Sequence, residues 1–333
     1  TFTSLKYRNM ITILYILIAF LGIVLLVQST RIGELLAELN NKNINDITDK
    51  DNDRNGILYF IVLVAFVIFV IWQMVAWNKF LLPDATSIHG VIIDGLMSFT
   101  MNTILIAFFI LTPLLAFFVL KYRGNSKRKA HYVTHSNKLE VFWTVIPAIF
   151  LTGVIVYGLR TWDKAMNVDT TNAMVVEVYA KQFDWTARYS GEDNKLGYAN
   201  YKLVEGPNQL GVDLEDINAH DDIVTKEIHL IKDKQVLFKF RSQDVIHSAF
   251  LPHFRVQMNC VPGMITQFAF TPTKTTNEMK EQEGEDFEYI LLCNKICGAA
   301  HYNMQIKVIV ETQEEYDNWI NQQKILKNTL TLK

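Results

Sequence analysis

Four long apolar stretches in the first 162 residues constrain this chain more than any other feature of its sequence. They run approximately over residues 10–27, 57–77, 104–120 and 141–159. Each approaches or exceeds the roughly 18 apolar residues that cross the hydrocarbon core of a bilayer. Pro113 and Pro147 lie inside the last two stretches, which packed membrane helices tolerate because neighbouring helices satisfy the freed backbone groups. We therefore predict four transmembrane helices.

The short loops between these stretches indicate their orientation. The loop before the fourth stretch carries Lys121, Arg123, Lys127, Arg128, Lys129 and Lys138. The 28–56 loop carries Arg31, Lys42, Lys50 and Arg54. By contrast, the 78–100 loop carries only Lys79. Because cytoplasmic loops are enriched in Lys and Arg, this pattern places ten positive residues inside against three outside, with both termini outside.

Two features of the membrane half have alternative interpretations. The first stretch resembles a signal peptide, since Lys6 and Arg8 precede it, but the apolar run is long and no small-residue cleavage site follows. Glu140 is predicted at the cytoplasmic mouth of the fourth helix. An ionisable group there is a functional candidate, although a membrane-edge carboxylate that simply faces water is the commoner case.

The chain after Trp162 has the character of a water-soluble β domain. Short alternating runs such as 176–179, 236–240, 265–270 and 306–310 predict strands, and a sandwich or barrel follows from their number. The acidic segments 213–222 and 278–286 are predicted to be solvated loops, and 314–327 a terminal surface helix.

The charge of this second half limits its partners. From Asp163 onward there are 18 Lys plus Arg against 25 Asp plus Glu, a net charge of −7. Nucleic acid is therefore excluded as a partner. An acidic face steers a basic partner, although a generally acidic soluble surface explains the charge equally well.

The residues with metal chemistry are concentrated in one short segment. Cys293, Cys297, His301 and Met304 have the spacing C-x3-C-x3-H-x2-M, and His247 precedes them by 46 residues. Two thiolates, two imidazoles and a thioether form a soft ligand set that suits copper better than hard cations. Zinc has little use for methionine. A catalytic Cys–His pair and a disulfide between the two cysteines are the alternatives, but neither requires the whole set.

Two further residues near this segment receive structural interpretations. Cys260 lies in a strand-like run and is predicted to be a small buried apolar residue. His253 is predicted to be a loop histidine that supports the site from outside the ligand set. The sequence contains no C-x-x-C-H motif, so covalently attached c-type haem is excluded.

At these residues the chain resembles the subunit II family of cytochrome c oxidases. The segments beginning Lys138-Leu-Glu-Val-Phe-Trp and Phe254-Arg-Val-Gln-Met-Asn carry the resemblance beyond the metal segment, over roughly 95–320. Together with the two predicted helices that precede the family's usual pair, it implies a four-helix membrane anchor followed by an all-β cupredoxin-like sandwich. Three parts are expected: 1–100, an extension with two transmembrane helices; 101–162, the helix hairpin typical of the family; and 163–333, an extracytoplasmic copper domain with a C-terminal helix.

The resemblance also implies a binuclear copper centre, called CuA, and assigns its ligands. Cys293 and Cys297 would bridge both coppers. His247 and Met304 would complete one copper, and His301 with the backbone carbonyl of Lys295 the other. The implied role is to relay electrons from a c-type cytochrome to haem in subunit I, where oxygen reduction and proton pumping take place.

Four residues compare with the family in informative ways. Lys295 stands where the family usually has a glutamate whose side chain also binds an interface magnesium ion. An ammonium group has no acceptor atom with which to bind a metal. In the run Gln182-Phe-Asp-Trp, Phe183 occupies the place of a tryptophan thought to admit electrons, and Trp185 of the same run is a second candidate. Glu140 falls at the family's entrance to a proton path.

The resemblance extends to partners and location. We expect subunit I and other oxidase subunits as partners, and a dedicated donor complex that contacts the two extra helices. We expect a multi-pass protein of a bacterial inner membrane with its copper domain on the periplasmic side. Quinol oxidases of the family lack the copper ligands, which this chain retains. The alternatives are a membrane-tethered copper-delivery module and a structural anchor with a vestigial domain, and the complete ligand set argues against the second.

Overall fold

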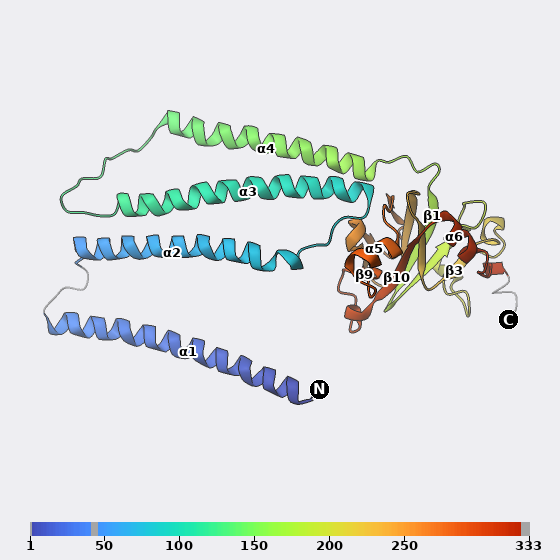
Figure 1. The fold of residues 1–333 in the computed structure, drawn as a ribbon, viewed down its shortest axis with the longest axis horizontal. Coiled ribbons are helices and arrows are strands. Elements are labelled where there is room, and N and C mark those ends of the chain that lie inside the picture. Colours follow the sequence, from blue (N-terminus) through green and yellow to red (C-terminus); the bar gives the residue numbers. More distant parts are fainter. Residues whose placement is uncertain (1, 41–45, 328–333) are drawn as a thin grey trace. The chain divides into compact units, whose positions relative to one another are not determined.

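The membrane half consists of four long helices. The computed structural model describes residues 2–40 and 46–327, and the side chains of 13–40 and 46–327. The helices are α1 (Phe2–Leu39), α2 (Asp49–Trp77), α3 (Ile88–Lys121) and α4 (Asn137–Met166) (Figure 1). In the described part of the chain, all four are long and apolar enough to cross a membrane, judged by length and composition. The prediction of four transmembrane helices is confirmed.

The helices extend beyond the apolar stretches that predicted them. Arg31 lies in α1, and Lys50 and Arg54 lie in α2, so the predicted 28–56 loop is much shorter. Backbone hydrogen bonds continue into polar sequence, and the acidic residues Asp49 and Asp51 in the first turn of α2 favour a helix start there. Lys42 and the side chains of Lys6 and Arg8 lie outside the described residues.

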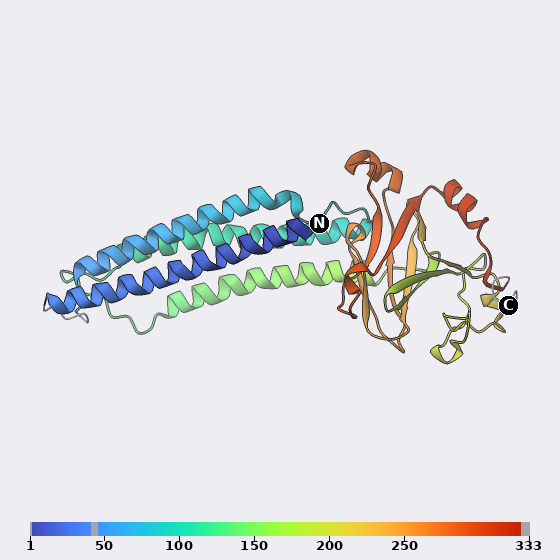
Figure 2. The same cartoon turned by 90° about the horizontal axis from the view of Figure 1, so that it is seen from below.

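The second half is a two-sheet β domain. Its strands are β1 (Met174–Lys181), β2 (Asp184–Tyr189), β3 (Ile223–Thr225), β4 (Ile228–Ile231), β5 (Val236–Ser242), β6 (His247–Leu251), β7 (Val256–Cys260), β8 (Thr266–Phe270), β9 (Tyr289–Cys293) and β10 (Gln305–Glu311). One sheet has the order β3-β2-β1-β5-β8 and the other β4-β10-β9-β6-β7. Figure 2 shows α4 leading into β1 of this domain.

The two sheets enclose one apolar core. Val176, Val178 and Ala180 alternate along β1 and are fully buried between the sheets, together with Phe238 and Phe240 of β5. This period of two places one face of each strand in the core, as expected for a sandwich. The prediction of an all-β sandwich is confirmed.

Two local predictions were wrong. The segment 278–286 was expected to be a loop, but α5 (Thr276–Glu283) occupies most of it, and Thr275 and Glu278 form a capping box at its start. The C-terminal helix α6 (Gln313–Ile320) ends well before Lys327, because the chain turns back so that Ile325 pairs with Ile223.

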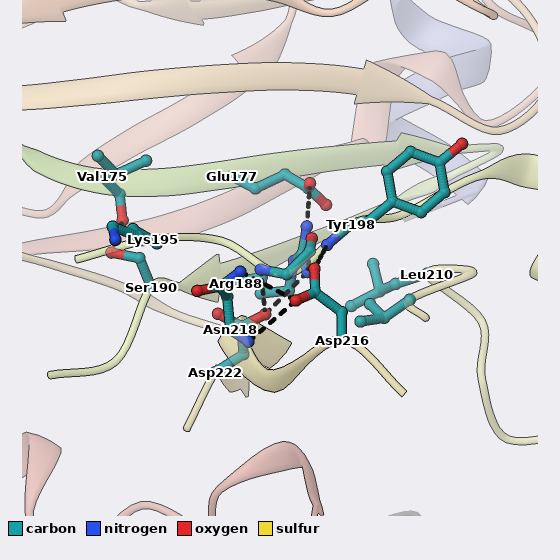
Figure 3. A network of polar contacts seen from close by, with 12 residues as sticks. Val175, Glu177, Arg188, Ser190, Lys195, Tyr198, Leu210, Asp216, Asn218 and Asp222 are labelled. Carbon is teal, nitrogen blue, oxygen red and sulfur yellow. Dashed lines mark hydrogen bonds and ion pairs between the residues drawn. The ribbon is translucent and has the colours of Figure 1, made fainter. Parts of the chain in front are cut away.

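The outer face of the first sheet carries a buried charge network. Glu177 accepts hydrogen bonds from Arg188 (2.7 Å) and from both Nε and Nη2 of Arg241 (3.0 and 2.8 Å). Arg188 also donates to Asp222 at 2.8 Å, as Figure 3 shows. The segment 190–222 covers this face, and Asp222 is fully buried. The expectation that 213–222 is a solvated loop was therefore wrong at Asp222, because this carboxylate pairs with a guanidinium from β2.

The network makes the stability of the domain depend on pH through Asp222. Burial raises the pKa of Asp222 from the usual 3.8 to about 6, and Arg188, which it shares with Glu177, compensates only in part. Its Oδ1 atom has no hydrogen-bond partner among the described residues. The folded state therefore holds this proton more tightly than the unfolded state does.

We expect the contribution of Asp222 to stability to be fully present below pH 3.8 and lost as the pH rises to about 6. The difference between these pKa values corresponds to about 3 kcal/mol. The measurement compares urea unfolding of the wild-type chain and of the Asp222→Asn variant from pH 3.5 to pH 7. A difference between them that stays constant over this range would contradict the prediction.

Candidate metal centre

Strand pairing brings the two ends of the metal segment together. β9 ends at Cys293, β10 begins at Gln305, and the two strands are antiparallel neighbours. The N–H of Cys293 donates to the carbonyl of Met304 at 3.0 Å, which closes the base of a loop. Residues 293–304, which we call the metal loop, are therefore held at both ends. His247 begins β6, the other neighbour of β9, so it lies beside the loop although it is distant in sequence.

The sulfur and nitrogen atoms of the predicted ligands converge. The Sγ atoms of Cys293 and Cys297 are 3.8 Å apart. Nδ1 of His247 lies 3.7 Å from Sγ of Cys293, and Nδ1 of His301 lies 3.5 Å from Sγ of Cys297. Sδ of Met304 is 3.8 Å from Sγ of Cys297. The structure thus brings all five predicted ligand side chains together.

The backbone of Lys295 completes the group. Its carbonyl oxygen lies 3.3 Å from Sγ of Cys293, and its side chain is exposed. Cys293 and Cys297 are free thiols, so the disulfide alternative is not realised. Ligand-type atoms of His247, Cys293 and Cys297 lie within 4.8 Å of one another, as a shared metal site requires. The donor set is soft and its atoms lie close together, so it fits copper.

Four of the five ligand side chains are shielded from water, and the fifth, His301, is half-buried. His247, Cys293, Cys297 and Met304 are all buried, with His247 and Met304 at most 1% exposed. Burial raises the pKa of Cys297 to about 11, and the neighbouring Cys293 adds to the effect. Since metal ligation requires the thiolate, binding of a metal releases protons.

A hydrogen-bond chain orients the ligands from behind. Nε2 of His247 lies 2.9 Å from Oδ1 of Asp244, which leaves Nδ1 to face the cysteines. Oδ2 of Asp244 accepts from the N–H of Gln182 at 2.7 Å, and the Gln182 side chain donates to the carbonyl of Cys297. Burial opposes ionisation of Asp244, but these hydrogen bonds outweigh it and hold its pKa below the usual value. Such partners fix the orientation of metal ligands.

Both aromatic candidates lie against the metal loop. Trp185 is almost fully buried, and its Nε1 donates to the carbonyl of Met304 at 3.3 Å. Phe183 is half-buried and covers Gly298, where a Cβ atom would lie only 2.7 Å from the Phe183 ring. Gly298 also has a φ of +143°, so glycine is required there for two reasons.

Glu140 is not part of this group. It lies in the first turn of α4, where Nδ1 of His135 is 2.9 Å from its Oε1 and both side chains are largely exposed. α4 has 30 residues and is therefore about 45 Å long, and the β domain follows its other end. Any role of Glu140 is separate from the metal centre.

Sequence reasoning missed the supporting residues. Asp244, Gln182 and Gly298 were not predicted, although an aspartate three residues before a ligand histidine is a usable signal. His253 packs its ring against Phe287 and Tyr289 at 5.1 and 5.3 Å, which gives it a packing role.

Cys260 behaves as predicted. It is fully buried in β7 directly opposite His247, and burial raises its pKa to about 12.

Comparison with known proteins covers most of the chain. The family model "Cytochrome C oxidase subunit II, transmembrane domain" matches residues 75–161, and "Cytochrome C oxidase subunit II, periplasmic domain" matches residues 174–312. The "Alternative cytochrome c oxidase subunit 2" of Bradyrhizobium diazoefficiens is 33% identical over 208 residues, covering 62% of this chain and 71% of that protein. The "Cytochrome c oxidase subunit 2" of Cereibacter sphaeroides is 26% identical over 254 residues, covering 72% and 77%.

The sequence predicted a resemblance over 95–320, whereas the matched region begins at residue 75 and ends at residue 312. It leaves α1 and most of α2 outside. α3 and most of α4 fall within the transmembrane match, and the sandwich and the metal loop fall within the periplasmic match. This chain belongs to the cytochrome c oxidase subunit II family, the electron-transfer subunits of haem-copper oxidases.

Proposed function

We propose that this chain receives electrons from a c-type cytochrome at a binuclear copper centre in the metal loop and passes them to haem in subunit I. The convergence of four side chains and one carbonyl of the metal loop with His247 of β6 carries this proposal. Two thiols only 3.8 Å apart, each with its own histidine, suit a pair of metals better than one.

We take the division of the ligands between two coppers from the family resemblance, while the contacts support the membership of the ligand set. Cys293 and Cys297 lie between the two histidines, and their thiolates would bridge both coppers. His247 and Met304 would complete one copper, and His301 with the carbonyl of Lys295 the other. Copper supplies the one-electron redox change. Strand pairing closes the base of the loop, and the ligand side chains other than His301 are buried, so that little rearranges when an electron arrives or leaves.

The surroundings support electron entry through the aromatic residues. Phe183 covers the loop backbone at Gly298, and Trp185 binds the carbonyl of Met304. We propose Phe183 as the entry point because it is the more exposed of the two. The side chain of Lys295 offers no acceptor, so we propose that the magnesium ion of the family is not held by this position.

We propose a bacterial inner membrane as the location, with the copper domain on the periplasmic side. The loop between α3 and α4 is rich in Lys and Arg, which favours the cytoplasm. We retain the three-part organisation 1–100, 101–162 and 163–333, with its first boundary inside α3. The two extra helices α1 and α2 would contact other membrane proteins, including a donor complex.

The experiment that tests the copper assignment uses the full-length chain in detergent, loaded with copper. We expect two coppers per chain and a seven-line hyperfine pattern in the electron paramagnetic resonance spectrum, from one electron shared by two nuclei. The Cys260→Ala variant is the matched control and should give the same spectrum. One copper with a four-line pattern, or rapid loss to a mild chelator, would refute the binuclear centre and favour copper delivery.

We propose Glu140 as a proton entrance on the cytoplasmic side. Its carboxylate lies at the helix start, exposed and paired with His135. In the complete oxidase, Glu140→Gln is expected to lower oxygen consumption about tenfold, because a positioned proton donor contributes at least this much to a rate. Oxygen-electrode assays measure the effect, with the copper spectrum as the control that should not change. Full turnover in this variant would remove Glu140 from the path.

A further inference from the structure

The segment that leads into α3 is built into the copper domain. The N–H of Thr86 donates to the carbonyl of His253 at 2.7 Å, and the N–H of Thr273 donates to the carbonyl of Thr86 at 2.9 Å. The hydroxyl of Ser87 donates to the carbonyl of Phe254, also at 2.7 Å. Thr86 and Ser87 are fully buried. The chain thus adds a short strand-like piece to the β domain immediately before it becomes a membrane helix.

Arg255 ties the first turns of α3 to the same place. Its Nε and Nη2 donate to the two carboxylate oxygens of Asp94, both at 2.8 Å. The guanidinium also donates to the carbonyls of Pro83 and Pro252. Such a two-pronged pairing fixes direction as well as distance, which a lysine cannot do. We call this pairing the Arg255–Asp94 clamp.

The first turn of α3 is shaped to lie against Arg255. A Cβ atom on Gly90 would lie 2.7 Å from the Ser87 hydroxyl and 3.1 Å from Cγ of Arg255, so the helix approaches this closely only with glycine there. The ring of His89 packs against Phe268 of β8 at 5.1 Å, and its Nε2 lies 3.4 Å from the carbonyl of Arg255. Packing and hydrogen bonds therefore both hold the first turn of α3 against Arg255.

The clamped turn is one strand away from a metal ligand. The turn η4 (Pro252–Phe254) directly precedes Arg255 and follows β6, whose first residue is His247. β6 pairs with β7 on one side and with β9 on the other. β6 has five residues and is paired on both edges, so its length is fixed. A displacement of η4 would therefore displace His247.

We propose that the Arg255–Asp94 clamp positions the metal centre relative to α3, and that both residues are positioning residues for electron transfer from this centre to the haem of the partner subunit. This inference rests on the proposed function. Electron transfer between fixed centres slows steeply with their separation. A partly exposed ion pair contributes little to folding, and Asp94 is partly exposed, so its main effect is on geometry.

The test uses the complete oxidase and follows two rates after a single electron is injected. One is reduction of the copper centre by the donor, and the other is passage of the electron from copper to haem. We expect Arg255→Met and Asp94→Asn each to slow the second rate about tenfold, since displacement of a reacting group by about 1 Å costs up to about 100-fold. The first rate and the copper spectrum should stay unchanged.

Two further variants sharpen the test. Arg255→Lys keeps the charge but loses the two-pronged pairing with Asp94. Its rate of electron transfer from copper to haem should therefore lie between those of wild type and Arg255→Met. Lys232→Met is the matched control, because it breaks a comparable ion pair with Glu278 that is distant in sequence from α3. It should leave both rates unchanged. Where Arg255→Met does not assemble, Asp94→Asn, which keeps the side-chain shape, gives the answer.

The outcomes separate the clamp from the function it rests on. If the wild-type complex shows no transfer from copper to haem, the proposed function fails. If the wild-type complex transfers the electron and the variants transfer it at the same rate, only the clamp is refuted. Parallel loss of copper, spectrum and rate in both Arg255→Met and Asp94→Asn would also refute it, because the pair would then act only in folding.

Discussion

The Cys297→Ser variant is expected to lose oxygen consumption by about 100-fold or more when a reduced c-type cytochrome is the donor. Cys297 is central to the metal loop, within 3.8 Å of Cys293, His301 and Met304. A serine hydroxyl does not ionise to bridge two coppers. Loss of an outer partner of a metal site already costs about 10- to 100-fold, so loss of a bridging ligand costs more.

Oxygen-electrode assays of the complete oxidase measure this effect, alongside copper content and the copper spectrum. Cys260→Ala is the matched control, since Cys260 is equally buried but belongs to β7 and is not a proposed ligand. It should retain activity. A Cys297→Ser oxidase that keeps the seven-line pattern would exclude Cys297 as a bridging ligand.

The Glu177→Gln variant is expected to lower the free energy of unfolding of the β domain by about 3–5 kcal/mol, the cost of leaving a buried ion pair without one partner. Glu177 is almost fully buried and is the acceptor for two guanidinium groups, from Arg188 and Arg241. Burial opposes its charge, but the two arginines outweigh burial and keep its pKa below the usual value. With glutamine there, two cations face each other without their shared anion.

Urea unfolding of the full-length chain in detergent, followed by tryptophan fluorescence, to which the buried Trp185 contributes, measures this loss. Glu288→Gln is the matched control, because its pair with Lys307 at 2.9 Å is half-exposed on the surface. We expect the control to change the stability by less than about 1 kcal/mol. Equal losses in the two variants would show that burial of the network has no energetic consequence.

What the sequence predicted well was local. An apolar run long enough for a membrane and a ligand set spaced over twelve residues each carry their information within one segment, so the four helices and the metal loop were readable. His247 was included in the ligand set by its residue type, but its position was not predictable from one segment. It lies 46 positions before Cys293, and its approach to that residue depends on the pairing of β6 with β9.

The failures share a physical cause. Asp222 looked solvated because its neighbours are acidic, and its partner Arg188 lies 34 positions earlier. The pairing of Arg255 with Asp94 joins residues 161 positions apart. α5 is different, since the capping box of Thr275 and Glu278 was a local signal that the surrounding run of acidic residues concealed.

The closing of the metal loop by β9 and β10 has a consequence for how such a protein can change over evolutionary time. Four of the five ligand side chains lie on a single uninterrupted segment whose two ends are joined by one hairpin base. Insertions in segment 190–222, which covers the first sheet, would not alter that hairpin base. New helices before α3 would not alter it either. The domain can therefore acquire new partners and new anchors by descent while the geometry of its redox centre is inherited intact.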